Sequence, residues 1–337
     1  MKSIYNLLII CCFLLSCKPQ PAPVSVQDIG KVPVEKCLLR SYLLDSTRLL
    51  YPTGIFQFGK YIILVEEKNN PTLSFWNADS LTYAFSSGYK GQGPDDVITP
   101  RPDYFYKTDS SFYILDSNIE REIRLDGKAI HIIRNTPIFI PDAINQLVRV
   151  NDSVYIMSGF NSGEGDSHIR FTTDGNYTFF GPYPPADVTE EQLTSFLYKF
   201  TAGREDKDVI IDFYQYINLI RIYTVDGELK KEVVLEGTSP RNNVYTQLFN
   251  GTIQPFFNML AAKKEYIAVL YYENFANREV YDWKAFPELQ IWTWNGELIK
   301  RMRFDKSFDN FTISDDNRLY ATNQDLPYTV YTCDLDL

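Results

Sequence analysis

The chain has 337 residues, a formal net charge of -10 and an aromatic content of 15%. The negative charge and the lack of any Lys/Arg cluster exclude nucleic acid as an expected partner, because phosphate backbones are bound by clustered basic side chains. Only two histidines occur, His131 and His168, which excludes a zinc site with three histidine ligands. Any Ser-His-Asp triad would depend on one of these two.

The first 16 residues have the organisation of a signal peptide. Lys2 gives the positive start, residues 4–15 form an apolar stretch that is short for a membrane span, and Ser16 is the small residue of a cleavage site. Cys17 follows Leu14-Leu15-Ser16, and this run resembles the lipobox of bacterial lipoproteins. The resemblance implies lipidation of Cys17 and a lipid anchor in the cell envelope, at the outer membrane, on its periplasmic side or at the cell surface. The alternative is a secretory peptide followed by an incidental cysteine.

Residues 17–34 are expected to be a lipidated cysteine followed by a flexible linker. The segment contains Pro19, Pro21, Pro23 and Pro33 and few side chains that could pack, and this composition is typical of an extended linker. We expect one folded domain at residues 35–337, since all-β folds often reach this length as a single domain.

Short runs rich in Tyr, Phe, Ile, Val and Leu recur through this domain and predict β-strands. Six such runs start at Tyr61, Phe112, Val154, Val209, Tyr266 and Leu319. Four turn dipeptides separate later runs: Asp126-Gly127, Asp174-Gly175, Asp226-Gly227 and Asn295-Gly296. These dipeptides accept positive φ at both central positions of a type I′ turn, so we expect type I′ hairpins in a repeat of antiparallel sheets.

The two ends of the domain complement each other. The sixth unit ends with an apolar run at residues 328–333 and lacks a fourth strand, whereas residues 35–44 read as a strand without a partner. Pairing of these two segments would close a ring, so we predict an all-β, six-bladed β-propeller. The alternative, a β-sandwich, leaves the lone strand unexplained. Thr189 and Gln192 form a capping box, which predicts a short helical insertion at residues 189–200.

The run Gly88-Tyr89-Lys90-Gly91-Gln92-Gly93-Pro94-Asp95-Asp96 follows the first blade. Together with the six units and the lipobox, it resembles the TolB-like six-bladed propeller lipoproteins, whose first blade commonly ends in Gly-x-x-Gly-x-Gly-Pro-acidic. The resemblance covers about residues 35–337. It implies the fold and the location, and it brings no catalytic residues to transfer.

The expected function is that of a binding or protein-interaction module for a protein, peptide or glycan. Asp95 and Asp96, after the first blade, and Tyr272 and Trp283, in an insertion of the fifth blade, are candidates for a ligand-contacting rim, because such loops gather on one face of a ring. The alternatives are a metal-dependent hydrolase or lactonase with a carboxylate site in the central channel, and a scaffold subunit with an exposed apolar patch. No cofactor is predicted, although carboxylates in the channel would leave room for a divalent cation.

Cys37 and Cys333 are the two cysteines of the folded domain. Cys333 ends the last strand and Cys37 lies in the strand expected to pair with it, where facing Cα atoms are about 4.5 to 5.5 Å apart. Export would place them in an oxidising compartment, where the two thiols could form a disulfide. The alternative is two buried free thiols.

Overall fold

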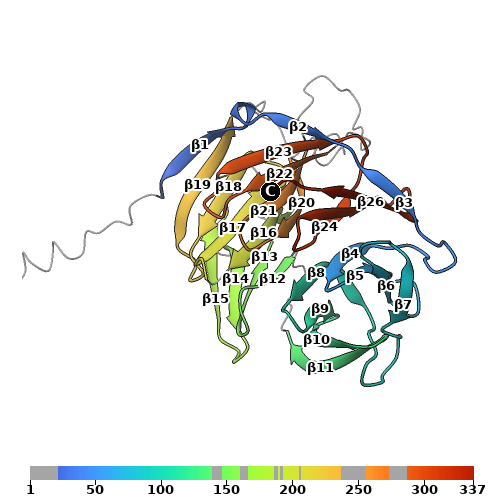
Figure 1. Cartoon of the computed structure of the whole chain (residues 1–337). Coiled ribbons are helices and arrows are strands. Elements are labelled where there is room, and N and C mark those ends of the chain that lie inside the picture. The colour runs from blue at the N-terminus through green and yellow to red at the C-terminus, as the bar shows by residue number, and fades with distance from the viewer. Residues whose placement is uncertain are drawn as a thin grey trace, which may run out of the picture.

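The computed structural model describes residues 22–138, 146–159, 166–185, 189, 193–204, 206–236, 256–272 and 287–337. These residues form six antiparallel units arranged in a ring, each with four strands that follow one another from the inside to the outside (Figure 1). The predicted six-bladed β-propeller is therefore confirmed.

The blades follow one another along the chain. Blade 1 contains β4 (Gly54–Phe58), β5 (Tyr61–Val65), β6 (Leu73–Asn77) and β7 (Tyr83–Ser87). Blade 2 contains β8 (Pro100–Lys107), β9 (Phe112–Asp116), β10 (Ile119–Asp126) and β11 (Ala129–Pro137). Blade 3 contains β12 (Gln146–Arg149), β13 (Val154–Ser158), β14 (Asp166–Thr172) and β15 (Tyr177–Pro182).

The second half of the ring is built in the same way. Blade 4 contains β16 (Lys199–Arg204), β17 (Val209–Tyr214), β18 (Leu219–Tyr223) and β19 (Leu229–Glu236). Blade 5 contains β20 (Phe257–Ala262), β21 (Ile267–Tyr271), β22 (Glu288–Trp292) and β23 (Leu298–Phe304). Blade 6 contains β24 (Asn310–Ile313), β25 (Arg318–Thr322), β26 (Thr329–Asp334) and the N-terminal strand β3 (Arg40–Leu43).

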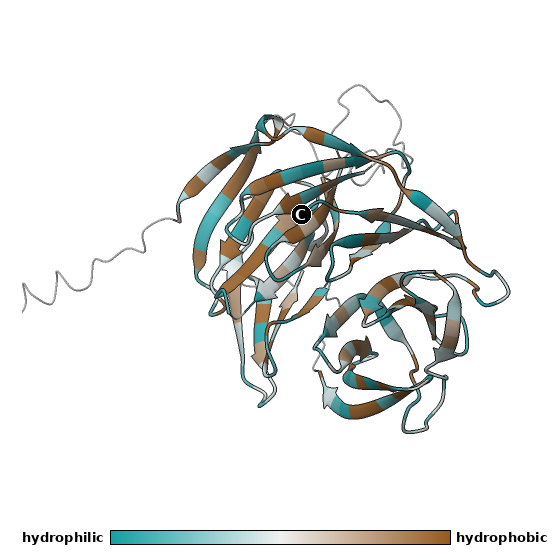
Figure 2. Cartoon of the chain, viewed as in Figure 1, coloured by the Kyte–Doolittle hydropathy of each residue, from teal (hydrophilic) through white to brown (hydrophobic). Residues whose placement is uncertain are grey.

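Apolar side chains between neighbouring blades hold the ring together, and each of the six interfaces has its own buried cluster. Every residue of the second strands β9, β13, β17 and β21 is buried. These strands are covered on both faces, which explains why their sequences read as continuous rather than alternating apolar runs. Apolar segments accordingly run through the interior strands in Figure 2.

The N-terminal strand closes the ring as predicted. Tyr42 of β3 pairs with Val330 of β26, and the Leu44 N–H donates to the Tyr328 carbonyl at 2.8 Å. A cluster that includes Leu44, Ile55 and Val330 then joins blade 6 to blade 1. Closure leaves only short outer edges in place of an open sheet edge.

The segment before this strand is not the flexible linker that its prolines suggested. From Val24 on it forms β1 (Val24–Asp28), the 3₁₀ turn η1 (Ile29–Lys31) and β2 (Val34–Cys37). β1 adds a parallel fifth strand to β19 of blade 4, and β2 adds one to β23 of blade 5. We call residues 24–43 the strap, because they run around the outside of blades 4, 5 and 6 (Figure 1).

Two local predictions need correction. Within the four dipeptides, only the glycines have positive φ. The N–H groups of Gly175, Gly227 and Gly296 each donate to the carbonyl of a threonine three residues earlier, which closes a tight turn. These three turns are type I turns followed by a left-handed glycine. The fourth loop consists of Gly127 and Lys128, and only Gly127 has positive φ. None of the four is type I′, which needs positive φ at both central residues. Among the described residues, the helix predicted at 189–200 is α2 (Leu193–Phe196), and it does not reach residue 200 because Lys199 and Phe200 belong to β16. No helix among the described residues is long and apolar enough to cross a bilayer.

Candidate functional site: the central channel

A channel runs along the axis of the ring and is lined by the innermost strand of every blade: β4, β8, β12, β16, β20 and β24. Its volume is ≈ 1610 Å³. Small residues on two of these strands, Ala202, Gly203, Ala261 and Ala262, leave space where the strands converge. A Cβ added to Gly203 would lie 3.3 Å from Val150 Cγ2 of the next blade, so the glycine also permits close packing of the wall.

One mouth of the channel, at the turns that leave the innermost strands, carries a three-residue ionic bridge. The Lys107 ammonium donates to Asp315 Oδ2 at 2.8 Å, and the Lys263 ammonium donates to Asp315 Oδ1 at 3.0 Å. Partial burial opposes ionisation of Asp315, but hydrogen bonds from the two lysines outweigh it and lower the pKa of this carboxyl. The bridge joins blades 2, 5 and 6 and leaves one more ammonium than carboxylate.

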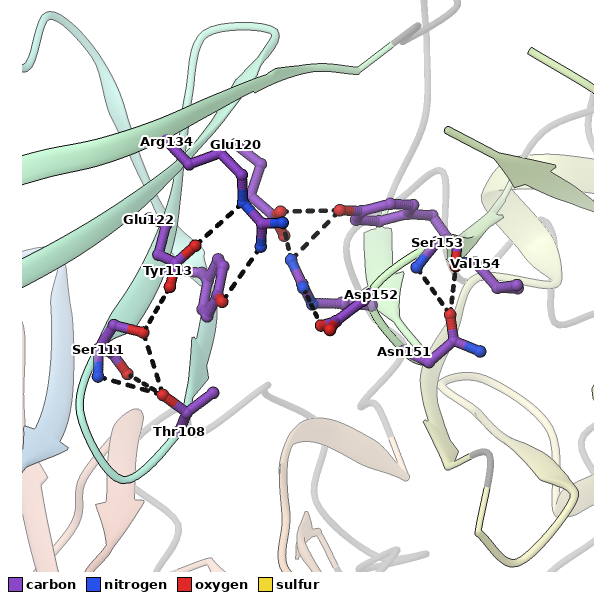
Figure 3. A network of polar contacts seen from close by, with 12 residues as sticks. Thr108, Ser111, Tyr113, Glu120, Glu122, Arg134, Asn151, Asp152, Ser153 and Val154 are labelled. Carbon is purple, nitrogen blue, oxygen red and sulfur yellow. Dashed lines mark hydrogen bonds and ion pairs between the residues drawn. The ribbon is translucent and has the colours of Figure 1, made fainter. Parts of the chain in front are cut away.

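Arg149, at the end of β12, contributes a cation to the channel wall between blades 2 and 3. Its guanidinium forms an ion pair with buried Glu120 and lies 4.1 Å from the centroid of the Tyr113 ring. Figure 3 shows Glu120, Tyr113 and Asp152 within one network of polar contacts. Burial alone would lower the pKa of Arg149, but Glu120 outweighs it and raises this pKa. Tyr106 also stacks near this guanidinium and remains 37% exposed. The mouth therefore presents ammonium, carboxylate and aromatic groups, and the Arg149 guanidinium is buried in the wall beside them.

Metal chemistry has little support in the described part of the chain. A carboxylate site would bring several Asp, Glu or His side chains to one point, and no group of three His, Cys, Asp or Glu residues able to hold a metal ion occurs among the described residues. The carboxylates at the mouth are instead separated: Asp152 pairs with Arg149, Asp206 with Arg204 and Asp315 with two lysines.

A second polar cluster lies inside the wall between blades 3 and 4. Ser167, His168, Lys199 and Asp212 are each 0% exposed. The Lys199 ammonium lies 2.9 Å from Asp212 Oδ2 and 2.7 Å from Ser167 Oγ, and burial lowers the pKa of Lys199 to about 8. Ser167 and Lys199 have the chemistry of a nucleophile and a base, but neither reaches solvent or the channel. This cluster is structural.

The predicted rim residues lie away from the channel. Asp95 accepts from the Ile132 N–H at 2.7 Å on the outermost strand of blade 2, and Asp96 accepts from the Gly93 N–H at 2.6 Å. A Cβ on Gly91 would lie 2.2 Å from Asp96 Oδ2, which explains this glycine of the motif. Neither aspartate lines the channel. Their contact with a ligand stays a prediction.

The other candidates divide between described and undescribed residues. Tyr272 is half-buried, and its N–H donates to the Phe256 carbonyl at 2.8 Å. Trp283 and Cys17 lie outside the described residues. His131 is half-exposed beside Asp95, at 3.2 Å.

Cys37 and Cys333 come together, although not as facing residues of one strand pair. β26 pairs with residues 40–43, and Cys37 belongs to β2, where it pairs with Phe304. The two thiols are free, yet they share one apolar cluster and each affects the pKa of the other; burial is the main cause that raises the pKa of both. The disulfide stays a prediction, and counting thiols under denaturing, non-reducing conditions decides it.

Sequence reasoning missed Lys107, Arg149 and Lys263 as channel residues. Lys107 and Arg149 end innermost strands and Lys263 directly follows one, so the three stand more than 40 residues apart and form no motif. A usable signal is position alone: a basic residue at the last position of an innermost strand, or just after it, lies at the channel wall.

The fold and the sequence define a six-bladed propeller of a known family. The family model described as "TolB-like 6-blade propeller-like" matches residues 33–316, and the chain belongs to this family. No curated protein matches the sequence.

Two solved structures share the fold. A Bacteroides fragilis protein described as exported has 8% identity, a TM-score of 0.53, and coverage of 92% of this chain and 98% of its own. A member of the DUF4221 family from Bacteroides vulgatus has 12% identity, a TM-score of 0.54, and coverage of 90% and 97%.

Proposed function

We propose that this protein is a lipid-anchored binding module of the bacterial cell envelope, and that its ligand binds in the central channel. The observation that carries the proposal is the channel itself: ≈ 1610 Å³, lined by all six blades, with mixed charges and an exposed tyrosine at one mouth. A pocket of this kind, with a few polar groups on a rigid frame, is the usual setting for ligand binding. The mixed lining suits a peptide or an oligosaccharide.

Export is supported by the signal-like N-terminus and by the similarity to a protein described as exported. Lipidation is tested directly in cells that are fed an alkyne-tagged fatty acid. We expect the wild-type protein to carry the tag and to sediment with membranes, and Cys17→Ala to lose both properties. Tag incorporation that survives Cys17→Ala would contradict the anchor.

Ligand binding is tested with an immobilised panel of peptides and of neutral and acidic oligosaccharides. Ala262→Trp fills the channel from an exposed position of β20, and we expect it to abolish any binding that the wild type shows. Ile133→Trp is the matched control, because Ile133 is exposed on the outermost strand of blade 2, far from the axis. Equal binding by both variants would show that the channel is not the ligand site.

A further inference from the structure

The strap determines from which side of the propeller the chain leads toward Cys17. β1 pairs with β19, the outermost strand of blade 4, so the N-terminal segment leaves from the circumference of the ring and not from a channel mouth (Figure 1). Six residues lie between Cys17 and Val24, so seven Cα–Cα steps join the two. At an extended length of roughly 3.3 to 3.6 Å per residue, this segment reaches at most about 25 Å. This step rests on the proposed lipid anchor at Cys17.

The surface beside this exit is apolar. Val24 and Val26 of β1 are 61% and 58% exposed, and they point to the same side because side chains alternate along a strand. Val234 of β19 stands in register with Val26 and is 36% exposed. We call these three residues the valine patch. Figure 2 shows apolar segments along β1 at the outer edge of the molecule.

The apolar character continues along the chain. Leu38, Leu43 and Leu50 are 76%, 83% and 53% exposed. Residues 24–50 contain four basic and three acidic side chains, in a chain whose net charge is -10. Residues 24–50 therefore carry no negative net charge that would repel an anionic membrane, and their exposed Val and Leu side chains suit the interface between headgroups and acyl chains.

We propose that the propeller lies on its side against the lipid bilayer, with the valine patch at the membrane surface. The axis of the channel then runs along the membrane plane. Both mouths of the channel stay open to solvent, so a ligand can enter from either end. A tether that left from a mouth would instead hold the channel axis perpendicular to the membrane, and the membrane would cover that mouth.

Nitroxide labels on the lipidated, full-length protein test this orientation. Cys37→Ser and Cys333→Ser remove the reactive thiols of the folded body and leave Cys17 for the lipid. Single labels are then placed by Val26→Cys at the patch, Asp109→Cys at the mouth and Ile133→Cys on blade 2. Each protein is reconstituted on vesicles of phosphatidylethanolamine and phosphatidylglycerol. Collisions of the label with oxygen and with a water-soluble nickel chelate are then measured.

We expect the Val26 label to show several-fold less nickel collision than the Ile133 label, and more oxygen collision. The Asp109 label should resemble the Ile133 label. A Val26 label as accessible to nickel as Ile133, on protein that floats with the vesicles, would overturn the orientation while leaving the anchor intact. An Asp109 label shielded from the nickel chelate would show that this mouth of the channel faces the membrane. Protein that does not float at all refutes the anchor and the orientation together. A Val26 label shielded without vesicles would assign the patch to a second copy of the chain.

Discussion

Lys199, Asp212 and His168 place three titratable groups in the wall between blades 3 and 4, where none of their side chains reaches solvent. A buried ion pair is favourable only when further hydrogen bonds satisfy both partners. Here Thr201 Oγ1 donates to Asp212 Oδ1 at 2.8 Å, and the His168 ring lies 3.0 Å from the same carboxylate. The cluster therefore fixes how blades 3 and 4 pack, and it does so in a pH-dependent way.

His168 should make the protein less stable as the pH falls. Burial lowers the pKa of His168; Asp212 opposes this, and Lys199 adds to it. Between pH 7 and 5.5 the unfolded chain therefore binds a proton that the folded chain does not, which reduces the free energy of unfolding by about 1 kcal/mol. We expect this loss in urea titrations of the wild type and expect His168→Gln to remove it.

His131 provides the matched control for this titration. It is the other histidine of the chain and its ring is half-exposed, so His131→Gln should keep the wild-type pH dependence. Should both variants retain the loss of stability, the pH dependence would come from carboxylates and not from the wall between blades 3 and 4.

At the scale of elements, Arg301 fastens the strap to blade 5. The guanidinium pairs with Glu288 at 2.6 and 2.9 Å, and its Nη1 donates to the carbonyls of Ile29 and Val32 at 2.9 and 3.2 Å. Both charged side chains are buried. One planar side chain thus joins a fork-like ion pair to the turn between β1 and β2, a geometry that a lysine cannot reproduce.

Arg301→Lys should loosen the strap without opening the ring. We expect amide hydrogen exchange at residues 29–36 to become several-fold faster, while exchange in β5 of blade 1 stays unchanged, because local opening is independent of global unfolding. Arg303→Lys is the control, since Arg303 lies 3.5 Å from Glu288 and is more exposed. Equal acceleration in blade 1 would mean that Arg301 supports the whole fold.

The ring as a whole was predictable because its signals are local or terminal. Continuous apolar runs identified the second strand of each blade. The lone strand predicted at residues 35–44 supplies the missing strand of the last blade through residues 40–43, whereas residues 35–37 belong to β2 and pair in blade 5. β1 and the partner of β2 were not predictable, because Pro19, Pro21, Pro23 and Pro33 dominate the composition while the pairing partners lie about 200 residues away or more. The ionic bridge at the channel mouth could not be predicted for the same reason, because Lys107, Lys263 and Asp315 come together only in the closed ring.

At the scale of the whole molecule, closure by β3 should matter far more than the added strand β1. The Leu44 N–H bonds to the Tyr328 carbonyl, and bonded pairs alternate along an antiparallel ladder, so Tyr42 and Val330 also form a hydrogen-bonded pair. Tyr42→Pro removes that donor from the strand that joins the two ends of the chain. Because the Val330 carbonyl then loses its donor, we expect the free energy of unfolding in urea to fall by about 1 to 3 kcal/mol.

Val26→Pro provides the comparison, because β1 is a fifth strand outside the four that make up blade 4. It should release β1 locally and change the free energy of unfolding much less than Tyr42→Pro does. If the two substitutions were equally destabilising, β1 would be as integral to the propeller as β3. If neither had an effect, the meeting of the two chain ends would not determine the stability of the ring.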